Sequence, residues 1–237
     1  MIEIVSATRR SPDAFWAESA LGRSLRRLAR DTRLVPQVAF ENRRGLSAVF
    51  NTRLDAGSPA DWLVFVHDDV WLDDHFLAER VLDGLARFDI IGVAGNRRRL
   101  PGQPAWAFAG AKPQGGFAWD APEHLSGVVA HGRHPFGALS HFGPVPAACE
   151  LLDGVFLAAR RSRLQAAGVR FDERFDFHFY DLDFCRTARD RGLRLGTWPV
   201  ALTHQSGGAF GSESWRQGYA RYLDKWGESP ARLPPAA

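Results

Sequence analysis

The sequence contains few cysteines and no long apolar run. Cys149 and Cys185 are the only cysteines among the 237 residues, so neither a disulfide framework nor a cysteine-rich zinc site is expected. We expect both thiols to be reduced and buried. No stretch approaches the roughly 18 apolar residues of a membrane-spanning helix, and the first residues, MIEIVSATRRSP, lack the apolar core of a signal peptide. These absences predict a soluble protein of the cytoplasm.

An excess of one charge sign is also lacking, because 30 lysines and arginines nearly balance 27 aspartates and glutamates. No helix-turn-helix or basic-aromatic sheet motif accompanies the basic run Arg97–Arg99, so we expect no nucleic-acid partner. The chain is instead 45% hydrophobic and 12% aromatic, which suits a packed core with an aromatic-lined cleft. We expect one domain over residues 1–227 and a disordered tail over 228–237.

Strand-like and helix-like segments alternate through the first 95 residues. Short apolar or β-branched runs predict strands, and apolar residues at helical spacing predict helices between them. The predicted strands are residues 2–8, 35–40, 62–66 and 89–95, and the predicted helices are 11–30, 46–54 and 73–87. This order is typical of an α/β fold, and the uninterrupted apolar run before His67 indicates a strand that is buried on both faces.

The pattern dissolves between Asn96 and Ala148 into Gly, Pro, His and Trp residues, with one hairpin predicted around LSGVVAHGR. We expect loops over a cleft here, because long irregular stretches are usually functional or mobile. Regular patterns then return: a strand and helix in ELLDGVFLAARRS, a helix ending at Gly192, and a strand RLGTWPVALTH ending at His204. The last predicted helix carries four aromatic residues on one face: Trp215, Tyr219, Tyr222 and Trp226.

The first group of residues that could do chemistry is His67, Asp68 and Asp69, at the end of a predicted buried strand. Ligands of open α/β sheets bind beyond the carboxyl ends of the strands, and carboxylate oxygens there suit Mg²⁺ or Mn²⁺ holding a diphosphate. A bound cation would neutralise charge on a leaving nucleoside diphosphate. The alternative is a solvated acidic turn or a helix cap.

Further candidates follow in the second half of the chain. Asp181 and Asp183 open a predicted helix, where a carboxylate can be a rigid base for an acceptor hydroxyl or simply an N-cap. His204 closes a strand beside a Gly-rich loop and could complete a metal shell, although a lone histidine is more often structural. Asp153, next to Gly154, could admit an acceptor closely or could form a turn.

Four segments, taken together and in order, resemble the family-2-like GT-A glycosyltransferases over residues 35–226. They are ENRRGLSAVFN, VFVHDDVWL, LLDGVFLAARRS and the long segment FDERFDFHFYDLDFCRTARDRGLRLGTWPVALTH. The resemblance implies a Rossmann-like α/β fold with a mostly parallel central sheet and helices on both faces. It also implies a nucleotide-sugar-binding half at residues 1–95 and an acceptor-binding and catalytic half at 96–227.

The resemblance implies a role for each matching residue. On the donor side, Asn42, Gly45 and Asn51 would line the nucleotide pocket, with Asp68 and Asp69 at the diphosphate. Mn²⁺ or Mg²⁺ would be held by Asp69 with help from His67 and His204. Asp181 takes the place of the catalytic base in an inverting displacement, and the acceptor side would comprise Asp153, Gly154, Asp183 and Arg186. The implied activity is transfer of a sugar from a nucleotide-diphosphate sugar to an acceptor hydroxyl, in bacterial surface polysaccharide or glycan synthesis.

The sequence departs from the family pattern at three places. His67 stands where the usual motif has its first Asp, Tyr180 stands where many relatives have Glu, and the first strand lacks the usual Pro-x-Asn loop. The degenerate motif at His67 keeps open a noncatalytic module that binds a nucleotide-sugar or glycan. The run Arg97–Arg99 and the aromatic face of the last helix also suggest contact with an anionic, lipid-linked acceptor at the inner face of the membrane.

Overall fold

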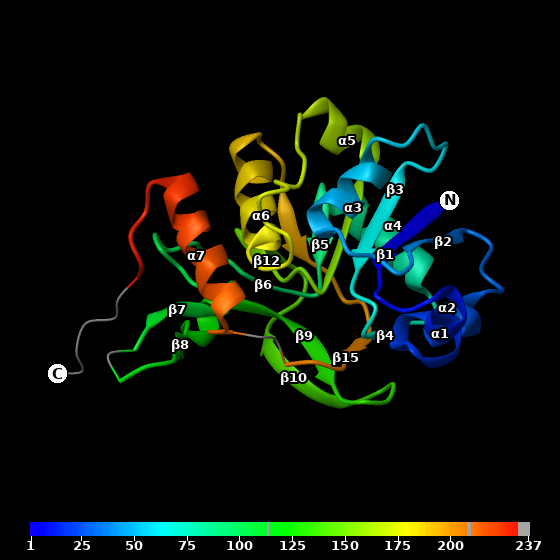
Figure 1. Cartoon of the computed structure of the whole chain (residues 1–237), viewed down its shortest axis with the longest axis horizontal. Coiled ribbons are helices and arrows are strands. Elements are labelled where there is room, and N and C mark those ends of the chain that lie inside the picture. Colours follow the sequence, from blue (N-terminus) through cyan, green and yellow to red (C-terminus); the bar gives the residue numbers. More distant parts are fainter. Residues whose placement is uncertain (113, 208–209, 232–237) are drawn as a thin grey trace.

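A seven-stranded sheet forms the centre of the fold (Figure 1). The computed structural model describes residues 1–112, 114–207 and 210–231. Across the sheet the strands are β11 (Ala147–Cys149), β14 (Leu195–Thr197), β5 (Ile90–Gly92), β13 (Phe156–Arg160), β3 (Trp62–Val66), β1 (Ile2–Ala7) and β2 (Leu34–Ala39). The expected α/β class is therefore found.

The central sheet is mixed but mostly parallel, as predicted, because five of its seven strands run in the same direction. Strands β2, β1 and β3 are parallel, as are β5 and β14, but β13 is antiparallel to both of its neighbours and β11 is antiparallel to β14. The short strand β12 (Leu151–Leu152) precedes β13 and belongs to another sheet.

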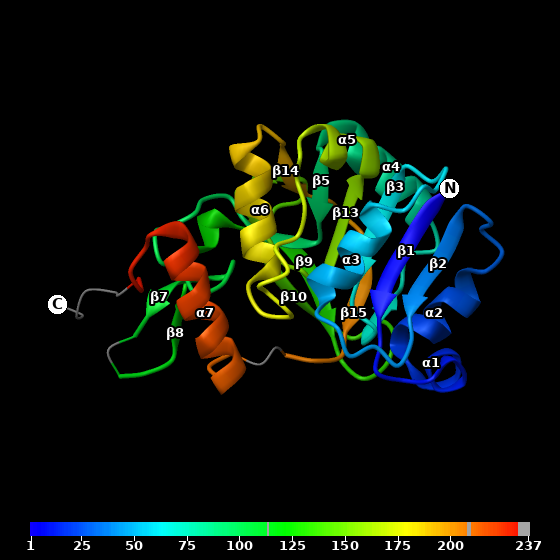
Figure 2. The same ribbon diagram turned by 45° about the horizontal axis from the view of Figure 1, so that its top comes forward.

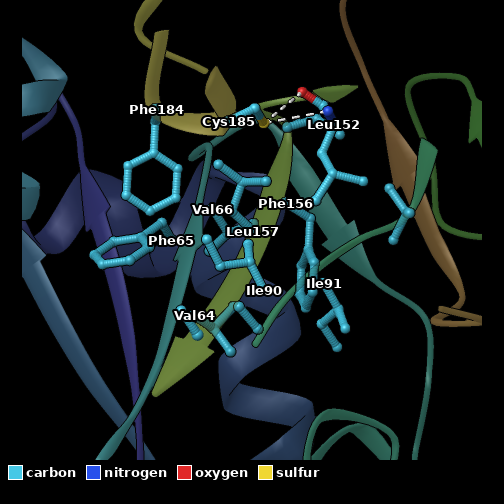
Figure 3. Close-up of a cluster of buried hydrophobic side chains, with 14 of the residues drawn as sticks. Val64, Phe65, Val66, Ile90, Ile91, Leu152, Phe156, Leu157, Phe184 and Cys185 are labelled. Atoms are coloured by element: carbon cyan, nitrogen blue, oxygen red, sulfur yellow. Dashed lines mark hydrogen bonds between the residues drawn. The ribbon is translucent and has the colours of Figure 1, made fainter. Parts of the chain in front are cut away.

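Helices cover both faces of this sheet (Figure 2). On one face, Phe50 of α3 (Leu46–Leu54) packs on Phe65 of β3, with ring centroids 4.8 Å apart. On the other, Gly84 of α4 (Leu77–Arg87) lies so close to Ile91 that a Cβ there would be 2.7 Å from its Cδ1. Figure 3 shows the buried cluster that these strands share with α6 (Tyr180–Asp190). The apolar run of β3 is thus buried on both faces, as predicted.

The predicted first helix is two helices, α1 (Pro12–Glu18) and α2 (Ala20–Leu28). Ser19 interrupts it: its hydroxyl donates to the carbonyl of Phe15 at 2.7 Å and accepts from the backbone N–H of Gly22 at 2.9 Å. Its side chain therefore satisfies groups at the end of one helix and the start of the next. The remaining helices are α5 (Arg161–Ala166), α7 (Glu213–Trp226) and the 3₁₀ turn η1 (Pro122–His124).

Several segments between Asn96 and Ala148 form strands, so the prediction of loops throughout this stretch is wrong for those segments, and the hairpin predicted around LSGVVAHGR is present. A second sheet contains β12, β6 (Ala94–Asn96), β9 (Leu125–His131), β15 (Leu202–His204) and β4 (Val70–Leu72), with β10 (Ala138–Gly143) paired to β9. The strands β7 (Phe108–Ala111) and β8 (Phe117–Trp119) form a separate hairpin. Glycines in this stretch allow close backbone approach: a Cβ at Gly127 would lie 2.3 Å from the carbonyl oxygen of Val93.

The last predicted strand is also divided, because β14 and β15 belong to different sheets and residues 198–201 connect them. The predicted tail begins with ordered residues: the N–H of Ala231 donates to the carbonyl of Gly102, and its own carbonyl accepts from Ala111. Positions 232–237 of that predicted tail lie outside the described residues. None of the helices within the described ranges has the length and apolar character needed to cross a membrane.

Candidate functional site

The turn between β3 and β4 carries His67, Asp68 and Asp69 and stands between two cavities. His67 lines a cavity of about 430 Å³, whereas Asp68 lines one of about 760 Å³. Phe177 lines both cavities and stacks on the His67 ring, with centroids 5.5 Å apart. Because β3 and β4 belong to different sheets, the turn between them places one polar side chain in each of the two cavities.

His67, Asp69 and His204 form a cluster whose ligand atoms all lie within 4.8 Å of one another. Antiparallel pairing of β15 with β4 sets His204 opposite Val70, one residue from Asp69. The Nε2 of His204 is 3.4 Å from one carboxylate oxygen of Asp69. The other oxygen, Oδ1, is buried and has no hydrogen-bond partner among the described residues. A buried acceptor without a partner, on a carboxylate that is clustered with two imidazoles, fits a bound cation.

The protonation of the cluster also suits a cation. Burial alone would raise the pKa of Asp69, but the hydrogen bond and charge of His204 bring it down to about 2. Burial lowers the pKa of His67, which keeps its imidazole neutral. The pKa of His204 is raised because Asp69 outweighs the opposing effect of burial. Metal binding requires a neutral imidazole, so a cation bound at His204 would displace any proton on the ligating nitrogen.

Tyr180 determines which ring nitrogen of His67 is available to bind a metal. The phenol donates its single proton to the carbonyl oxygen of Gly154 at 2.7 Å, so in its 2.9 Å hydrogen bond with His67 the phenol oxygen must accept. The Nε2 of His67 therefore carries the proton, and Nδ1 keeps a lone pair for a metal. Tyr180 stands where the sequence pattern has Glu, and the structure gives it this orienting role.

Asp181 lines the 430 Å³ cavity from the first turn of α6. Its oxygens accept from the backbone N–H of Gly154 at 3.0 Å and of Leu182 at 2.9 Å. Burial, followed by the negative charge of Asp153, raises its pKa to about 7. A carboxyl group with a pKa near neutral is suited to accept a proton at physiological pH.

The backbone before α6 is held by α7. Phe179 has a positive φ of 66°, a left-handed conformation that is uncommon for an aromatic residue. Its ring is buried against Trp215, Tyr219 and Tyr222, with centroids 5.2 to 5.4 Å away. The predicted aromatic face of the last helix therefore holds the chain one residue before Tyr180.

Asp153 and Gly154 lie at the same cavity, on the connection from β12 to β13. The carboxylate of Asp153 accepts from the indole N–H of Trp106 at 2.8 Å and from the backbone N–H of Val155 at 2.9 Å. Gly154 permits the close approach of α6, since a Cβ there would be 2.3 Å from the phenol oxygen of Tyr180. Both predicted acceptor-side residues thus face the space beside Asp181.

Asp183 and Arg186, also predicted on the acceptor side, do not line this cavity. Asp183 is buried and accepts from Lys225 at 2.8 Å and from Trp226 at 3.0 Å. Arg186 pairs with Glu228 at 2.9 Å, so both residues attach α6 to the end of α7. Successive helical residues are rotated by about 100°, so positions 181 and 183 point to opposite sides of α6.

The 760 Å³ cavity lies beyond the carboxyl ends of β1, β2 and β3. Asn42, Gly45 and Asp68 line it as predicted, and the hydroxyl of Thr8 donates to Asp68 at 2.6 Å. Asn51 does not: it is buried and exchanges two hydrogen bonds with the backbone of Phe171, at 2.8 and 3.1 Å. Asn51 lies on the side of α3 that faces the core, and because its side chain is polar the sequence does not indicate this burial.

Sequence reasoning missed two sets of lining residues. Four arginines line the larger cavity: Arg9, Arg10, Arg43 and Arg44. Their position just after the first two predicted strands is a signal that could have found them. The smaller cavity has an aromatic lining, formed by Trp106, Phe108, Trp119, Phe142, Phe177, Phe179, Tyr180, Phe210 and Trp215. Four of these side chains come from residues 96–148, where no periodic pattern marks them.

Two of the three arginines of the predicted basic surface at Arg97–Arg99 are held in ion pairs. Arg98 pairs with the buried Asp120, and Arg99 pairs with Glu228 at 2.8 Å. These two guanidinium groups neutralise internal carboxylates and connect the strands to the chain after α7, whereas Arg97 is exposed. Contact of this segment with an anionic acceptor at a membrane stays a prediction.

No protein-family model and no curated protein matches the sequence. Solved structures do match. The catalytic domain of Drosophila β1,4-galactosyltransferase 7, in complex with xylobiose, has a TM-score of 0.50 and 9% identity over 92% of this chain and 79% of that chain. GalNAc-T7 with UDP, GalNAc and Mn²⁺ has a TM-score of 0.51 and 12% identity over 94% of this chain and 48% of that chain. Similarity at these identities shows the fold, which is the GT-A fold.

Proposed function

We propose that this chain, with its GT-A fold, transfers a sugar from a nucleoside-diphosphate sugar to an acceptor hydroxyl, using a divalent cation. The observation that most supports this is the shared cavity of Asp181 and His67. Asp181 has a pKa of about 7, and His67 belongs to a cluster suited to a cation. Tyr180 contacts His67 and precedes Asp181, so the candidate base and the candidate metal site have a fixed relation.

The larger cavity is the proposed donor site. It lies beyond the carboxyl ends of three parallel strands, where nucleotides bind in open α/β sheets. Guanidinium groups recognise phosphate oxygens through paired N–H donors, and four arginines line this space. Residues 1–95 would thus provide most of the donor site, and residues 96–227 most of the acceptor side.

The proposed metal ligands are His67, Asp69 and His204. Mg²⁺ takes mainly oxygen ligands, so a set with two imidazoles disfavours it, and Mn²⁺ is the better fit of the two expected cations. Bound there, Mn²⁺ would offset the negative charge that develops on the leaving diphosphate. Asp68 lies on the other side of the turn and lines the proposed donor site, where a hydrogen bond from Thr8 orients its carboxylate toward the donor.

Asp181 is the proposed base. An acceptor hydroxyl in the smaller cavity would pass its proton to the carboxylate as its oxygen bonds to the anomeric carbon and the bond to the diphosphate breaks. A single in-line displacement of this kind inverts the anomeric configuration. The cytoplasmic location expected from the sequence composition, and the role in bacterial surface polysaccharide synthesis implied by the resemblance, stay predictions.

The first test is a thermal-shift screen against UDP-, GDP-, dTDP- and CMP-sugars, each with and without Mn²⁺. A ligand at about 100 times its Kd stabilises the native state by about 2.7 kcal/mol, which for a chain of this size raises Tm by roughly 5 to 10 °C. We expect such a shift with one nucleotide class, and only with Mn²⁺. No shift with any donor would refute the proposal. A shift without turnover of the labelled donor, with acceptors supplied, would indicate a binding module instead.

A further inference from the structure

The mouth of the smaller cavity presents aromatic rings to solvent. Trp119, Phe177 and Phe210 all line it, and they are 56%, 51% and 45% exposed. Trp119 is supported from behind by Phe142, stacked at 5.9 Å, and by the edge of Phe108 at 5.2 Å. These contacts orient the indole while much of it stays uncovered. Clustered exposed apolar side chains of this kind mark a binding surface.

The described lining of the cavity contains neither lysine nor arginine. Asp153 and Asp181 supply its carboxylates, and its basic side chains are the imidazoles of His67, His131, His178 and His204. A phosphate, sulfate or carboxylate on the acceptor would therefore meet two carboxylates and no guanidinium or ammonium group of the described lining.

From this juxtaposition of exposed aromatic rings with carboxylates and a described lining without lysine or arginine, we infer that the acceptor is an uncharged saccharide or glycoside that lies flat against Trp119. The inference rests on the proposed function and specifies its acceptor. The C–H face of a sugar ring is apolar and weakly positive, so it packs well on the electron-rich face of an indole. The hydroxyl groups at the ring edge remain free to reach Asp153 and Asp181. An anionic lipid-linked acceptor does not fit this lining.

The experiment uses the full chain on a glycan array, with Mn²⁺ and the nucleotide identified by the thermal-shift screen. The array carries neutral glycans and the same glycans bearing a sialic acid, a uronic acid or a sulfate. We expect binding to neutral members and at least about tenfold weaker binding to their anionic partners. Trp119→Ala should weaken neutral-glycan binding about tenfold, and Trp119→Phe should restore most of it. Phe76→Ala is the matched control, because Phe76 is 64% exposed and does not line the cavity.

Equal or stronger binding of the anionic members would overturn the inference, as would no binding of any glycan by a protein that still binds its nucleotide. Retained affinity in Trp119→Ala would also overturn it. Failure of the proposed function looks different, since the nucleotide itself would then give no Mn²⁺-dependent shift. The thermal-shift screen thus separates the two failures before any acceptor is added.

Discussion

Replacing Asp181 with Asn tests the proposed base most directly. The side chain keeps its size and can still accept one of the two backbone hydrogen bonds from Gly154 and Leu182. It cannot accept the proton of an acceptor hydroxyl. Because a positioned base contributes about 10² to 10⁴ in rate, we expect kcat to fall by about 10³. Donor affinity should stay within about twofold, since Asp181 does not line the donor cavity.

The pH dependence follows from the raised pKa of Asp181, which is about 7. The ionised form is the active one, so wild-type kcat should fall about tenfold for each pH unit below 7 and level off above about pH 8. The residual rate of Asp181→Asn should be independent of pH over the same range, because an amide does not titrate.

As pH rises from 4 to 7, the free energy of unfolding should fall while activity rises. The pKa of Asp181 is raised from an ordinary 3.8, first by burial and then by Asp153. Between pH 4 and 7 the unfolded chain has lost this proton while the folded protein keeps it, so stability falls as pH rises and stays low above pH 7. The pKa difference corresponds to about 4 kcal/mol, and the lost hydrogen bond offsets about 1 kcal/mol. Asp181→Asn should thus be about 3 kcal/mol more stable than wild type at pH 8, without this gain at pH 4.

The assay measures release of nucleotide from the identified donor with and without acceptor, and urea unfolding at pH 4 and 8. Asp83→Asn is the control, because Asp83 is exposed on α4, on the face of the sheet opposite α3, and should leave both readouts unchanged. Turnover of Asp181→Asn within about tenfold of wild type, or the same pH profile in both proteins, would refute the assignment of the base.

Three further substitutions separate chemistry from structure. His204→Ala should abolish the Mn²⁺-dependent rise in Tm, because it removes one of three ligands. Gly154→Ala should destabilise the fold by about 2 kcal/mol and weaken Mn²⁺ binding, because its Cβ would lie 2.3 Å from Tyr180 Oη. Asp183→Asn should lower the free energy of unfolding by about 1 kcal/mol, since it weakens one of the two carboxylate contacts of Lys225 while Asp172 stays 2.8 Å away, and turnover of the folded protein should stay within about twofold.

Matched variants complete these three tests. His75→Ala removes an exposed histidine and should keep the Mn²⁺ response, and a full response in His204→Ala would place the metal elsewhere. Gly57→Ala should be tolerated, because no atom lies within 4 Å of its Cβ, and equal stability of both alanine variants would show that Gly154 is not confined. A large loss of turnover in Asp183→Asn at unchanged stability would restore its predicted acceptor role.

The sequence alone determines which chemistry is available and roughly where. Local periodicity gives β3 as a strand buried on both faces and α6 as a helix opening near Asp181, because strand and helix spacing are properties of neighbouring residues. It also places His67–Asp69 and His204 at strand ends, where functional groups of α/β sheets gather.

Tertiary structure decides which of these residues share a cavity. The pairing of β15 with β4 brings His204 to Asp69 from a distance of 135 positions, a contact that no local pattern encodes. The orientation of α6 places Asp181 at the cavity and Asp183 against Lys225, although both are aspartates in the first turn of the helix. Likewise, β9 and β11, within residues 96–148, pair with β15 and β14, which are distant in the sequence. Sequence fixes the side chains and their local spacing, whereas burial and pairing between distant segments decide which carboxylate becomes a base and which a structural partner.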